Sequence, residues 1–473
     1  MDLSLLNEVY SPVDFKDKGH QLIDDLSKHI SQVFNKDFDK VIDWKDPNES
    51  LSFWRNFLEK GNESTLFKEV IKRSTHLHHP KYIGHQVGPA APITLLTSMI
   101  SAVLNNGTAV YEMGMVTNAM ERIITELLCK KIGYSISESS GFLTSGGTLA
   151  NLTALLSARK AKASTDVWKK GHTRPLGIMV SEDAHYCIER AAKIMGLGEE
   201  GIIKIPVKDN FSLNISKLDF LYQRAIDKGI EVFAIVGSAP VTATGIVDNL
   251  NSLGDFAVKH NLWFHIDAAH GGGALFSYKY KKQLRGISKA DSVIIDGHKM
   301  MMMPGITTAL LYKNKSTSNA TFSQKADYLL EDSKESDWYN SGKRTFECTK
   351  NMMALHWFVL LKKFGEEVFN QYVTTLYDLG RDFSKLIEND ANFELAVQPM
   401  TNIVCFRYID KTKSQKELNE LNHNIRQHLL EDGEFYLVQT TLRGIRYLRT
   451  SLMNPFTTKE HLAQLINKIK KVV

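Results

Sequence analysis

Lys299 is the residue of this chain with the clearest chemical potential. An apolar run at residues 293–295 is followed by Asp296-Gly297-His298-Lys299. Four methionines come directly after the lysine. An apolar strand would deliver this lysine, with a histidine beside it, to its own carboxyl end. A lysine withdrawn from water can form a Schiff base with a carbonyl group. A surface lysine after a strand is the alternative. This stretch alone does not decide between a Schiff-base lysine and a surface lysine.

A glycine-containing turn offers a second kind of chemistry. Ser145-Gly146-Gly147-Thr148 lies between an apolar run at 142–144 and a helical pattern at 149–159. Glycines let a ligand approach the backbone closely, and the free N–H groups at the start of a helix bind phosphate. An ordinary turn between strand and helix is the alternative. The spacing matches neither a dinucleotide-binding GxGxxG nor a Walker loop, so neither of those ligands is favoured.

Two further polar side chains follow apolar runs. Asp267 ends the run at 262–266, and its carboxylate could lie under a flat ligand and keep an aromatic nitrogen protonated. Capping of the next turn is the alternative for Asp267. His185, after the run at 178–180, could stack on a ligand ring or transfer a proton. A purely structural histidine is the alternative there.

Together these side chains match the needs of one cofactor. Pyridoxal 5'-phosphate (PLP) requires an anion site, a carboxylate for its pyridine nitrogen, contacts for its ring and a lysine that forms a Schiff base. The chain offers a phosphate turn, a histidine, an aspartate and a lysine in that order, each after a short apolar run. The combination therefore predicts a PLP site, although each motif alone is ambiguous.

Alternating apolar and helical patterns indicate the fold that would position these groups. Short apolar runs recur between residues 142 and 312, with helical patterns such as 215–225 and 249–259 between them. This alternation predicts an α/β fold with a mostly parallel sheet covered on both faces. Sheets of this kind bind ligands at the carboxyl ends of their strands, which is where the candidate residues fall.

The two ends of the chain show different patterns. Helical spacing dominates the first 80 residues and returns at 352–372 and 377–387. Strands at 402–408 and 446–452 around a helix at 416–430 then predict a smaller α+β lobe. We therefore predict an N-terminal helical segment at 1–85 that dimerises, a large cofactor-binding domain at 86–345 and a small C-terminal domain at 346–473.

Composition narrows the class of protein. The 473 residues are 43% hydrophobic and 23% charged, with a net charge of +5 and no block of like charges, so binding to nucleic acid or to a membrane surface is not indicated. No apolar run is long enough to span a membrane, and the acidic N-terminus lacks the apolar core of a signal peptide. Four scattered cysteines without a CxxC pair favour a reducing, cytoplasmic location. The histidines at 76, 78 and 79 lack the spacing of a helical ligand set, so we predict no metal site.

The motifs also resemble those of the group II PLP-dependent amino-acid decarboxylases, the family of glutamate, aromatic-amino-acid and histidine decarboxylases. The resemblance extends from about residue 79 to about residue 358 and more loosely beyond. It implies the aspartate aminotransferase fold (fold type I), with a mostly parallel seven-stranded sheet in the large domain and a small C-terminal α+β domain. The matching segments are HPKYIGHQ (79–86), YEMG with NAMERIITELL (111–128), TSGGTLANLTALLSARK (144–160), SEDAHYCIERAA (181–192), HIDAAHGGG (265–273) and DGHK (296–299).

The resemblance implies roles for the cofactor residues. Lys299 would bond to PLP and act in catalysis, His298 would lie beside the phosphate, and Asp267 would pair with the pyridine nitrogen. Ala269 and His185 would contact opposite faces of the ring, with His185 also acting on the substrate. The remaining cofactor contacts that it implies are Ser145, Gly146, Gly147, Thr148, Ser238 and Asp296.

Other matches concern the substrate. Tyr328 would return a proton to the substrate carbon after CO2 leaves; a solvent-exposed loop tyrosine is the alternative. Arg344 matches an arginine near the substrate end, with an ion-pairing role as the alternative. The resemblance places Tyr82, Ile83, Gly84, His85 and Gln86 in the substrate pocket. That set is polar enough to favour a polar substrate side chain.

Two positions depart from the family pattern. Asp296-Gly297 replaces the commoner Asn/Asp-Pro or Asp-Ala before His-Lys, and His270 stands where tyrosine is frequent. Neither change removes a required group, so both bear on the identity of the substrate.

The resulting prediction is a cytoplasmic homodimer, with active sites at the interface, that converts an L-amino acid with a polar side chain into its amine and CO2. An aminotransferase or lyase, an aldehyde-forming oxidative deaminase and a catalytically silent PLP-binding protein are the alternatives. Tyr328 disfavours the oxidative deaminase, and the intact set of Lys299, Asp267 and His185 disfavours the silent protein.

Overall fold

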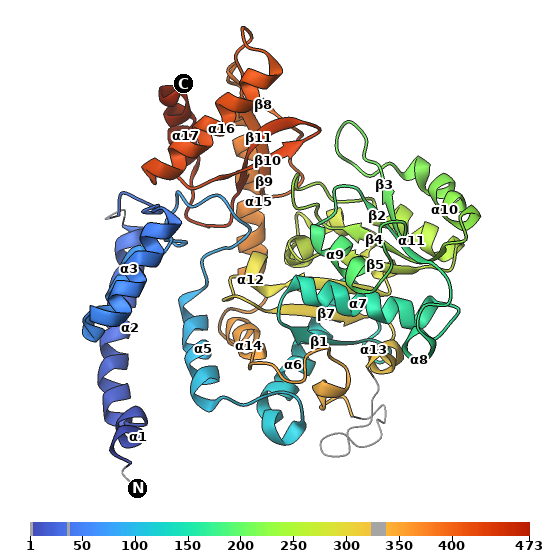
Figure 1. Cartoon of the computed structure of the whole chain (residues 1–473), viewed down its shortest axis with the longest axis horizontal. Coiled ribbons are helices and arrows are strands. Elements are labelled where there is room, and N and C mark those ends of the chain that lie inside the picture. The colour runs from blue at the N-terminus through green and yellow to red at the C-terminus, as the bar shows by residue number, and fades with distance from the viewer. Residues whose placement is uncertain (1–2, 36–37, 323–336) are drawn as a thin grey trace. The chain divides into compact units, whose positions relative to one another are not determined.

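The computed structural model describes residues 3–35, 38–322 and 337–473 (Figure 1). The chain divides into two compact units: Met1–His85 with Arg407–Val473, and Gln86–Phe406. The three-part organisation expected from the sequence stays a prediction.

A seven-stranded sheet forms the centre of the larger unit, in the order β1-β7-β6-β5-β4-β2-β3. β7 runs antiparallel to both of its neighbours, and the other neighbouring pairs are parallel. The predicted mostly parallel seven-stranded sheet is therefore confirmed. The strands are β1 (Ser140–Thr144), β2 (Leu176–Ser181), β3 (Ile202–Ile205), β4 (Glu231–Ser238), β5 (Trp263–Asp267), β6 (Ser292–Asp296) and β7 (Thr308–Tyr312).

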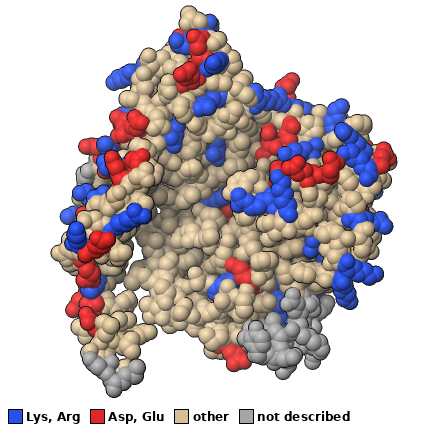
Figure 2. Space-filling view, in the orientation of Figure 1, with Lys and Arg blue, Asp and Glu red and all other residues tan. Residues whose placement is uncertain are grey.

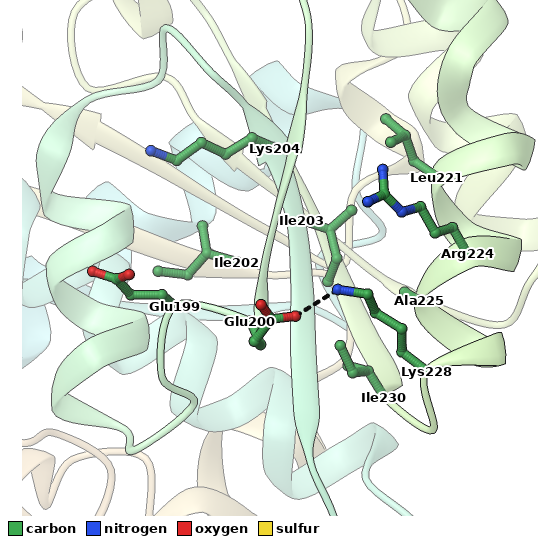
Figure 3. A pocket seen from close by; sticks show the side chains of 10 residues that line it. All are labelled: Glu199, Glu200, Ile202, Ile203, Lys204, Leu221, Arg224, Ala225, Lys228 and Ile230. Carbon is green, nitrogen blue, oxygen red and sulfur yellow. Dashed lines mark hydrogen bonds and ion pairs between the residues drawn. The ribbon is translucent and has the colours of Figure 1, made fainter.

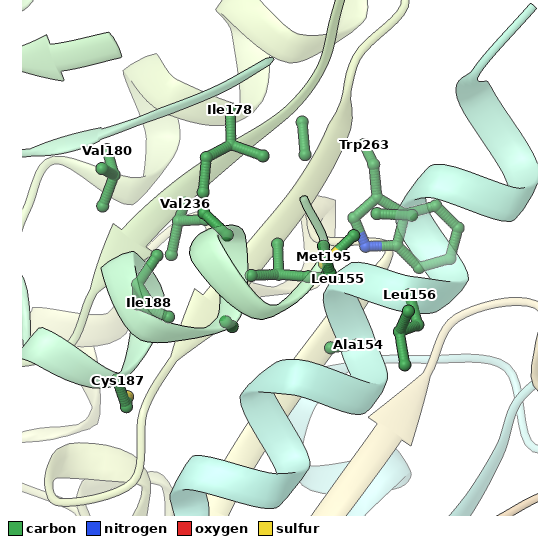
Figure 4. Packing of buried hydrophobic residues seen from close by; sticks show 14 of the residues in the cluster. Ala154, Leu155, Leu156, Ile178, Val180, Cys187, Ile188, Met195, Val236 and Trp263 are labelled. Atoms are coloured by element: carbon green, nitrogen blue, oxygen red, sulfur yellow. The ribbon is translucent and has the colours of Figure 1, made fainter. Parts of the chain in front are cut away.

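Both faces of this sheet are covered. Helix α7 (Gly147–Lys162) and helix α9 (Tyr186–Ile194) pack on one face, where Trp263 of β5 joins their apolar side chains (Figure 4). Gly237 of β4 faces the other way, so that a Cβ there would meet Leu250 and Leu253 of helix α11 (Leu250–Lys259). Coverage of both faces explains why the strands are continuously apolar instead of alternating.

The remaining helices of the larger unit include two that the sequence pattern divided wrongly. The predicted helix at 352–372 is broken by Gly365, whose φ of 67° ends α14, and the predicted gap between residues 372 and 377 lies inside one continuous helix, α15. The helices are α5 (Pro92–Leu104), α6 (Tyr111–Ile132), α8 (Val167–Lys170), α10 (Leu218–Asp227), α12 (Gly297–Met300), α13 (Lys315–Thr321), α14 (Ala354–Phe364) and α15 (Glu367–Glu388).

The smaller unit begins with helices, as expected from the first 80 residues. Ser11 and Asp46 cap the second and third of them, each followed by a proline at the first helical position. The helices are α1 (Ser4–Val9), α2 (Pro12–Phe34), α3 (Pro47–Lys60) and α4 (Leu66–Arg73).

The C-terminal region mixes strands and helices, as predicted. It contains β8 (Phe393–Leu395), β9 (Ile403–Tyr408), α16 (Gln415–Asp432), β10 (Val438–Leu442), β11 (Ile445–Ser451) and α17 (Lys459–Val472). β10 and β11 pair antiparallel, with Val438 opposite Arg449. β8 and β10 were not expected, since neither has a continuous apolar run.

Acidic and basic side chains are interspersed over the face drawn in Figure 2, as the small net charge suggests. None of the described helices combines the length and the apolar character needed to cross a membrane.

Candidate active site

A cavity of about 320 Å³ lies at the carboxyl ends of several strands of the large sheet. Its walls come from the turns that follow β1, β2, β4, β5 and β6, together with the start of α7. The lining residues are Ser145, Gly146, Gly147, Thr148, Asn151, His185, Cys187, Pro240, Thr242, Asp267, Ala269, His270, Asp296, His298, Lys299 and Ile306.

The turn between β1 and α7 forms one wall. Gly146 has a φ of 99°, a conformation that L side chains rarely adopt, and α7 begins at the next residue. Among the described residues no side chain caps this helix, and its first turn carries no acidic residue of its own. The backbone N–H groups of that first turn are therefore available to an anion.

Lys299 extends into the cavity from α12. Its Nζ lies 3.2 Å from Oδ2 of Asp296. Burial lowers the pKa of Lys299, but the negative charges of Asp296 and Asp267 outweigh burial, so the pKa is raised overall. The structure thus holds Lys299 as a cation.

Asp296 is buried between the lysine and the phosphate turn. Its Oδ1 accepts a hydrogen bond of 2.5 Å from Oγ1 of Thr308, and a Cβ on Gly147 would lie 3.4 Å from both carboxylate oxygens. Nε2 of His298 lies 3.5 Å from Oδ2 of Asp296. Asp296 is therefore the main negative charge beside Lys299.

His185 is the N-cap of α9. Its Nδ1 accepts a hydrogen bond of 3.3 Å from the backbone N–H of Cys187, so Nε2 carries the proton of the neutral ring. Burial lowers the pKa of His185, an effect that Lys299 reinforces and that Asp267 opposes. The ring is consequently neutral near pH 7, with Nε2–H as the donor left for the cavity.

Asp267 ends β5 and is held by two donors. Its Oδ2 accepts from Nδ2 of Asn151 at 2.9 Å, and its Oδ1 accepts from the backbone N–H of Ala269 at 3.1 Å. These hydrogen bonds fix the orientation of the carboxylate.

The donor set of this cavity fits PLP. An uncapped helix start suits the phosphate, the partly buried amine of Lys299 suits the aldehyde, and the fixed carboxylate of Asp267 suits a cationic ring nitrogen. In the described part of the chain, no group of three or more His, Cys, Asp or Glu side chains could hold a metal ion.

The structure brings most of the predicted cofactor residues into this one cavity. Those that line it are Lys299, His298, Asp267, Ala269, His185, Ser145, Gly146, Gly147, Thr148 and Asp296.

Other predicted residues lie elsewhere. Ser238 is buried at the end of β4, where its N–H donates to Asp248, and does not line the cavity. Arg344 is buried over the ring of Phe142, and its Nη2 donates to the carbonyl of Trp338 at 2.7 Å.

The remaining predicted residues are Gln86, Tyr82, His85 and Tyr328. Gln86 belongs to the larger unit but is not among the lining residues. Tyr82 and His85 belong to the smaller unit. Tyr328 lies outside the described residues.

The cavity also contains residues to which the sequence analysis gave no role. Asn151 follows Gly147 by one helical turn on α7, within the motif TSGGTLANLT. This spacing puts both residues on one face of the helix and could have predicted that Asn151 lies at the site. Thr242 and Pro240 follow Ser238 in the turn after β4. Cys187 and Ile306 complete the wall, and no pattern in the sequence points to them.

A second cavity, of about 220 Å³, lies beside β3 and α10 (Figure 3). Two of its charged side chains form an ion pair, in which Nζ of Lys228 lies 2.7 Å from Oε2 of Glu200. Aliphatic side chains such as Ile203 and Ile230 form much of the remainder. None of the predicted site residues lines it, so we place the active site in the first cavity.

Comparisons with known proteins agree with this chemistry. The pyridoxal-dependent decarboxylase conserved domain matches residues 62–409. An aromatic-L-amino-acid decarboxylase of Bacillus atrophaeus is 26% identical over 467 residues, covering 97% of this chain and 95% of that protein. An acidic amino acid decarboxylase of Xenopus tropicalis is 26% identical over 483 residues, covering 98% and 94%.

Among solved structures, we compare one that is similar over nearly the whole chain. It is the glutamate decarboxylase domain of diaminobutyrate-pyruvate transaminase and L-2,4-diaminobutyrate decarboxylase from Vibrio parahaemolyticus. The identity is 25%, the TM-score is 0.82, and the match covers 95% of each chain. The relatives therefore share a reaction class but differ in the substrates that their names state.

Proposed function

This chain belongs to the pyridoxal-dependent decarboxylase family and is a PLP-dependent amino-acid decarboxylase, and we propose that its substrate carries a polar, preferably acidic, side chain. The observation that carries the substrate proposal is the presence of further polar side chains in the lining of the cavity, where Thr242 and His270 lie beside the cofactor residues. A pocket built for an aromatic side chain would be lined mainly by apolar and aromatic groups.

A second observation favours an acidic side chain. In the smaller unit, burial lowers the pKa of His85, and the positive charges of Arg449 and Arg426 lower it further. The family resemblance assigns His85 to the substrate pocket, so a substrate anion would meet a cationic environment there. The proposal rests on that assignment, which a substrate screen tests.

The cofactor roles follow from the geometry of the cavity. The N–H groups at the start of α7 would hold the phosphate, with Ser145, Gly146, Gly147 and Thr148 shaping the turn. Lys299 would carry the cofactor, Asp267 would hold a proton on its ring nitrogen, and His185 and Ala269 would contact its two faces. His298, Asp296 and Ser238 would act from the surroundings.

PLP supplies an electron sink that stabilises the charge left on the substrate carbon when CO2 departs. The protein's part is to bind, orient and transfer protons. Nε2–H of His185 would donate to the substrate carboxylate, because its Nδ1 already accepts from the N–H of Cys187. Tyr328 would return a proton to the substrate carbon, and the amine of Lys299 would displace the product. The predicted substrate contact of Arg344 stays part of the proposal.

The test is a screen of the common amino acids, with cysteine sulfinate and diaminobutyrate added, that follows CO2 and amine together. Glutamate, aspartate or cysteine sulfinate should give CO2 and amine in equal amounts. A keto acid would indicate an aminotransferase, and an aldehyde with oxygen consumption an oxidative deaminase. Turnover of aromatic amino acids alone would contradict the substrate proposal, and PLP binding without any turnover would indicate a silent protein.

We further propose a cytoplasmic homodimer. Helix α5 exposes Leu96, Ile100 and Val103 on a surface that a second copy would cover, and α1 and α2 add further exposed apolar residues. Cys129, Cys187, Cys348 and Cys405 are all free thiols, which suits a reducing compartment. Sedimentation of the holoprotein as a single 53.5 kDa chain would contradict the dimer.

A further inference from the structure

A row of buried polar side chains lies behind Asp267 and takes no direct part in the proposed chemistry. We infer that Asn151, His265 and Ser292, anchored on Trp263, form a one-way hydrogen-bond chain that holds Asp267 as an oriented anion. The inference deepens the proposed function, since it rests on the role of Asp267 toward the cofactor ring nitrogen. In it, Asn151, His265 and Ser292 are positioning residues, because they act on the cofactor only through Asp267.

The strand places these groups in line. Trp263, His265 and Asp267 alternate along β5 and therefore point to the same face of the sheet, toward α7. Asn151 reaches down from α7, and Ser292 lies directly opposite His265 on β6. Every link of the chain thus comes from a rigid element.

Each link has the length of an ordinary hydrogen bond. The distances are 2.9 Å from Asp267 Oδ2 to Asn151 Nδ2, 2.8 Å from Asn151 Oδ1 to His265 Nε2, 2.8 Å from His265 Nδ1 to Ser292 Oγ, and 2.9 Å from Ser292 Oγ to Trp263 Nε1. The exposed fractions of Asn151, His265, Ser292 and Trp263 are 1%, 0%, 0% and 2%. Water therefore does not compete for these groups.

The chemistry of the two ends fixes the direction of every bond. A carboxylate only accepts, so Asn151 must present its N–H to Asp267 and its carbonyl oxygen to His265. That oxygen only accepts, so Nε2 of His265 must carry a proton. At the far end the indole N–H of Trp263 only donates, so Oγ of Ser292 accepts from it.

The neutral state of His265 determines the direction of the remaining bond, between His265 and Ser292. Burial lowers its pKa to about 4, so at neutral pH the ring carries one proton, which the previous argument places on Nε2. Nδ1 must then accept, and the hydroxyl of Ser292 donates to it. All donors consequently point from Trp263 toward Asp267.

A hydrogen-bond chain with one direction polarises each successive bond. Here the polarised bonds end on the carboxylate of Asp267, which accepts the last of them. The amide of Asn151 cannot turn over without placing its oxygen against that carboxylate. Its second N–H is also engaged, at 3.2 Å from Sγ of Cys187. The hydrogen-bond chain therefore fixes the orientation of the Asp267 carboxylate.

The test compares affinities of the apoprotein for PLP and for an analogue in which a carbon replaces the ring nitrogen, measured by calorimetry. The ratio of the two affinities isolates the contact with Asp267. In Ser292→Ala the ratio should fall about tenfold, a change of the size of one lost hydrogen bond. Ser157→Ala is the matched control, because it removes a buried hydroxyl that bonds Tyr312 and has no link to Asp267; its ratio should not change.

Variants at His265 test the direction of the chain. A glutamine can donate from its nitrogen and accept on its oxygen as the neutral histidine does, so His265→Gln should keep a ratio near that of the wild type. His265→Met can do neither and should resemble Ser292→Ala. A wild-type ratio in both Ser292→Ala and His265→Met, with folding intact by circular dichroism, would overturn the inference.

A measurement on the unmutated apoprotein covers the case in which these variants do not fold. Nitrogen-15 NMR of labelled histidines should show His265 as a neutral ring protonated on Nε2. A His265 ring protonated on Nδ1, or on both nitrogens, would contradict the proposed direction of the hydrogen-bond chain. Failure of the wild type to bind PLP at all would instead contradict the proposed function, so the two failures can be told apart.

Discussion

At the scale of single residues, the pairing of Lys299 with Asp296 is the most consequential feature. Asp296 belongs to the Asp296-Gly297 pair, one of the two places at which the sequence departs from the commoner family pattern, and the structure puts its carboxylate 3.2 Å from the lysine Nζ. Burial alone would lower the pKa of Lys299, yet Asp296 and Asp267 raise it overall. Only the neutral amine can attack an aldehyde, so this charge should slow attachment of the cofactor near neutral pH.

Asp296→Asn tests that consequence. Loss of the carboxylate charge should lower the pKa of Lys299, so that more of the amine is neutral at a given pH. The rate of PLP attachment to the apoprotein, followed by absorbance, should then rise at lower pH than in the wild type. Thr308→Val is the control, because it removes the hydrogen bond to Asp296 but keeps the charge. An unshifted pH profile in Asp296→Asn would rule out this role.

At the scale of elements, the turn after β4 depends on a buried acid. Oδ2 of Asp248 accepts from the backbone N–H of Ser238 at 2.8 Å, and the N–H of Asp248 donates to the carbonyl of Ser238 at 3.0 Å. These two bonds close the turn that carries Pro240 and Thr242 to the cavity. Oδ1 of Asp248 has no hydrogen-bond partner among the described residues. Burial, reinforced by Asp183, raises the pKa of Asp248 to about 7.

This acid should make stability depend on pH. From pH 3.8, the ordinary pKa, to about pH 7, the folded protein keeps a proton on Asp248 that the unfolded chain has released. Stability therefore falls as pH rises through this window and is lowest, for this group, above it. Asp248→Asn should be more stable than the wild type by about 4 kcal/mol near pH 8 and should lose that advantage near pH 4. Urea unfolding of both proteins at both pH values measures the difference in their free energies of unfolding. A difference that is the same at pH 4 and pH 8 would contradict the prediction.

The sequence predicted the elements well wherever burial dictates composition. Strands covered on both faces must be continuously apolar, so β1 to β7 were visible as short runs, and their ends located Lys299, Asp267 and His185. β8 and β10 were missed because partial exposure leaves no such run. The boundary between α14 and α15 depends on the backbone of Gly365, which an apolar pattern does not register.

Long-range contacts limited the prediction of the site. Asn151 and Asp267 are 116 residues apart, and only the packing of α7 on β5 joins them. The segment around Arg344 matched the family motif, but the structure buries its side chain against Phe142. Local spacing carries no information about such placements.

At the scale of the whole molecule, the protein is a decarboxylase whose proposed cofactor residues lie together at one edge of a single sheet. The cavity, the phosphate turn and Lys299 all belong to the larger unit, Gln86–Phe406. His85, which we propose as a substrate contact, belongs with Arg426 and Arg449 to the smaller unit. A cofactor held in the larger unit should therefore be attached through Lys299 whichever amino acid is the substrate.

Chemical trapping of the cofactor would identify the lysine to which it is attached. Borohydride fixes PLP permanently on the amine that carries it, and peptide mass spectrometry then identifies the lysine. The account predicts a phosphopyridoxyl group on the peptide containing Lys299, and none after the same treatment of Lys299→Ala. Trapping on a different lysine, or no trapping in a wild-type protein saturated with PLP, would contradict it.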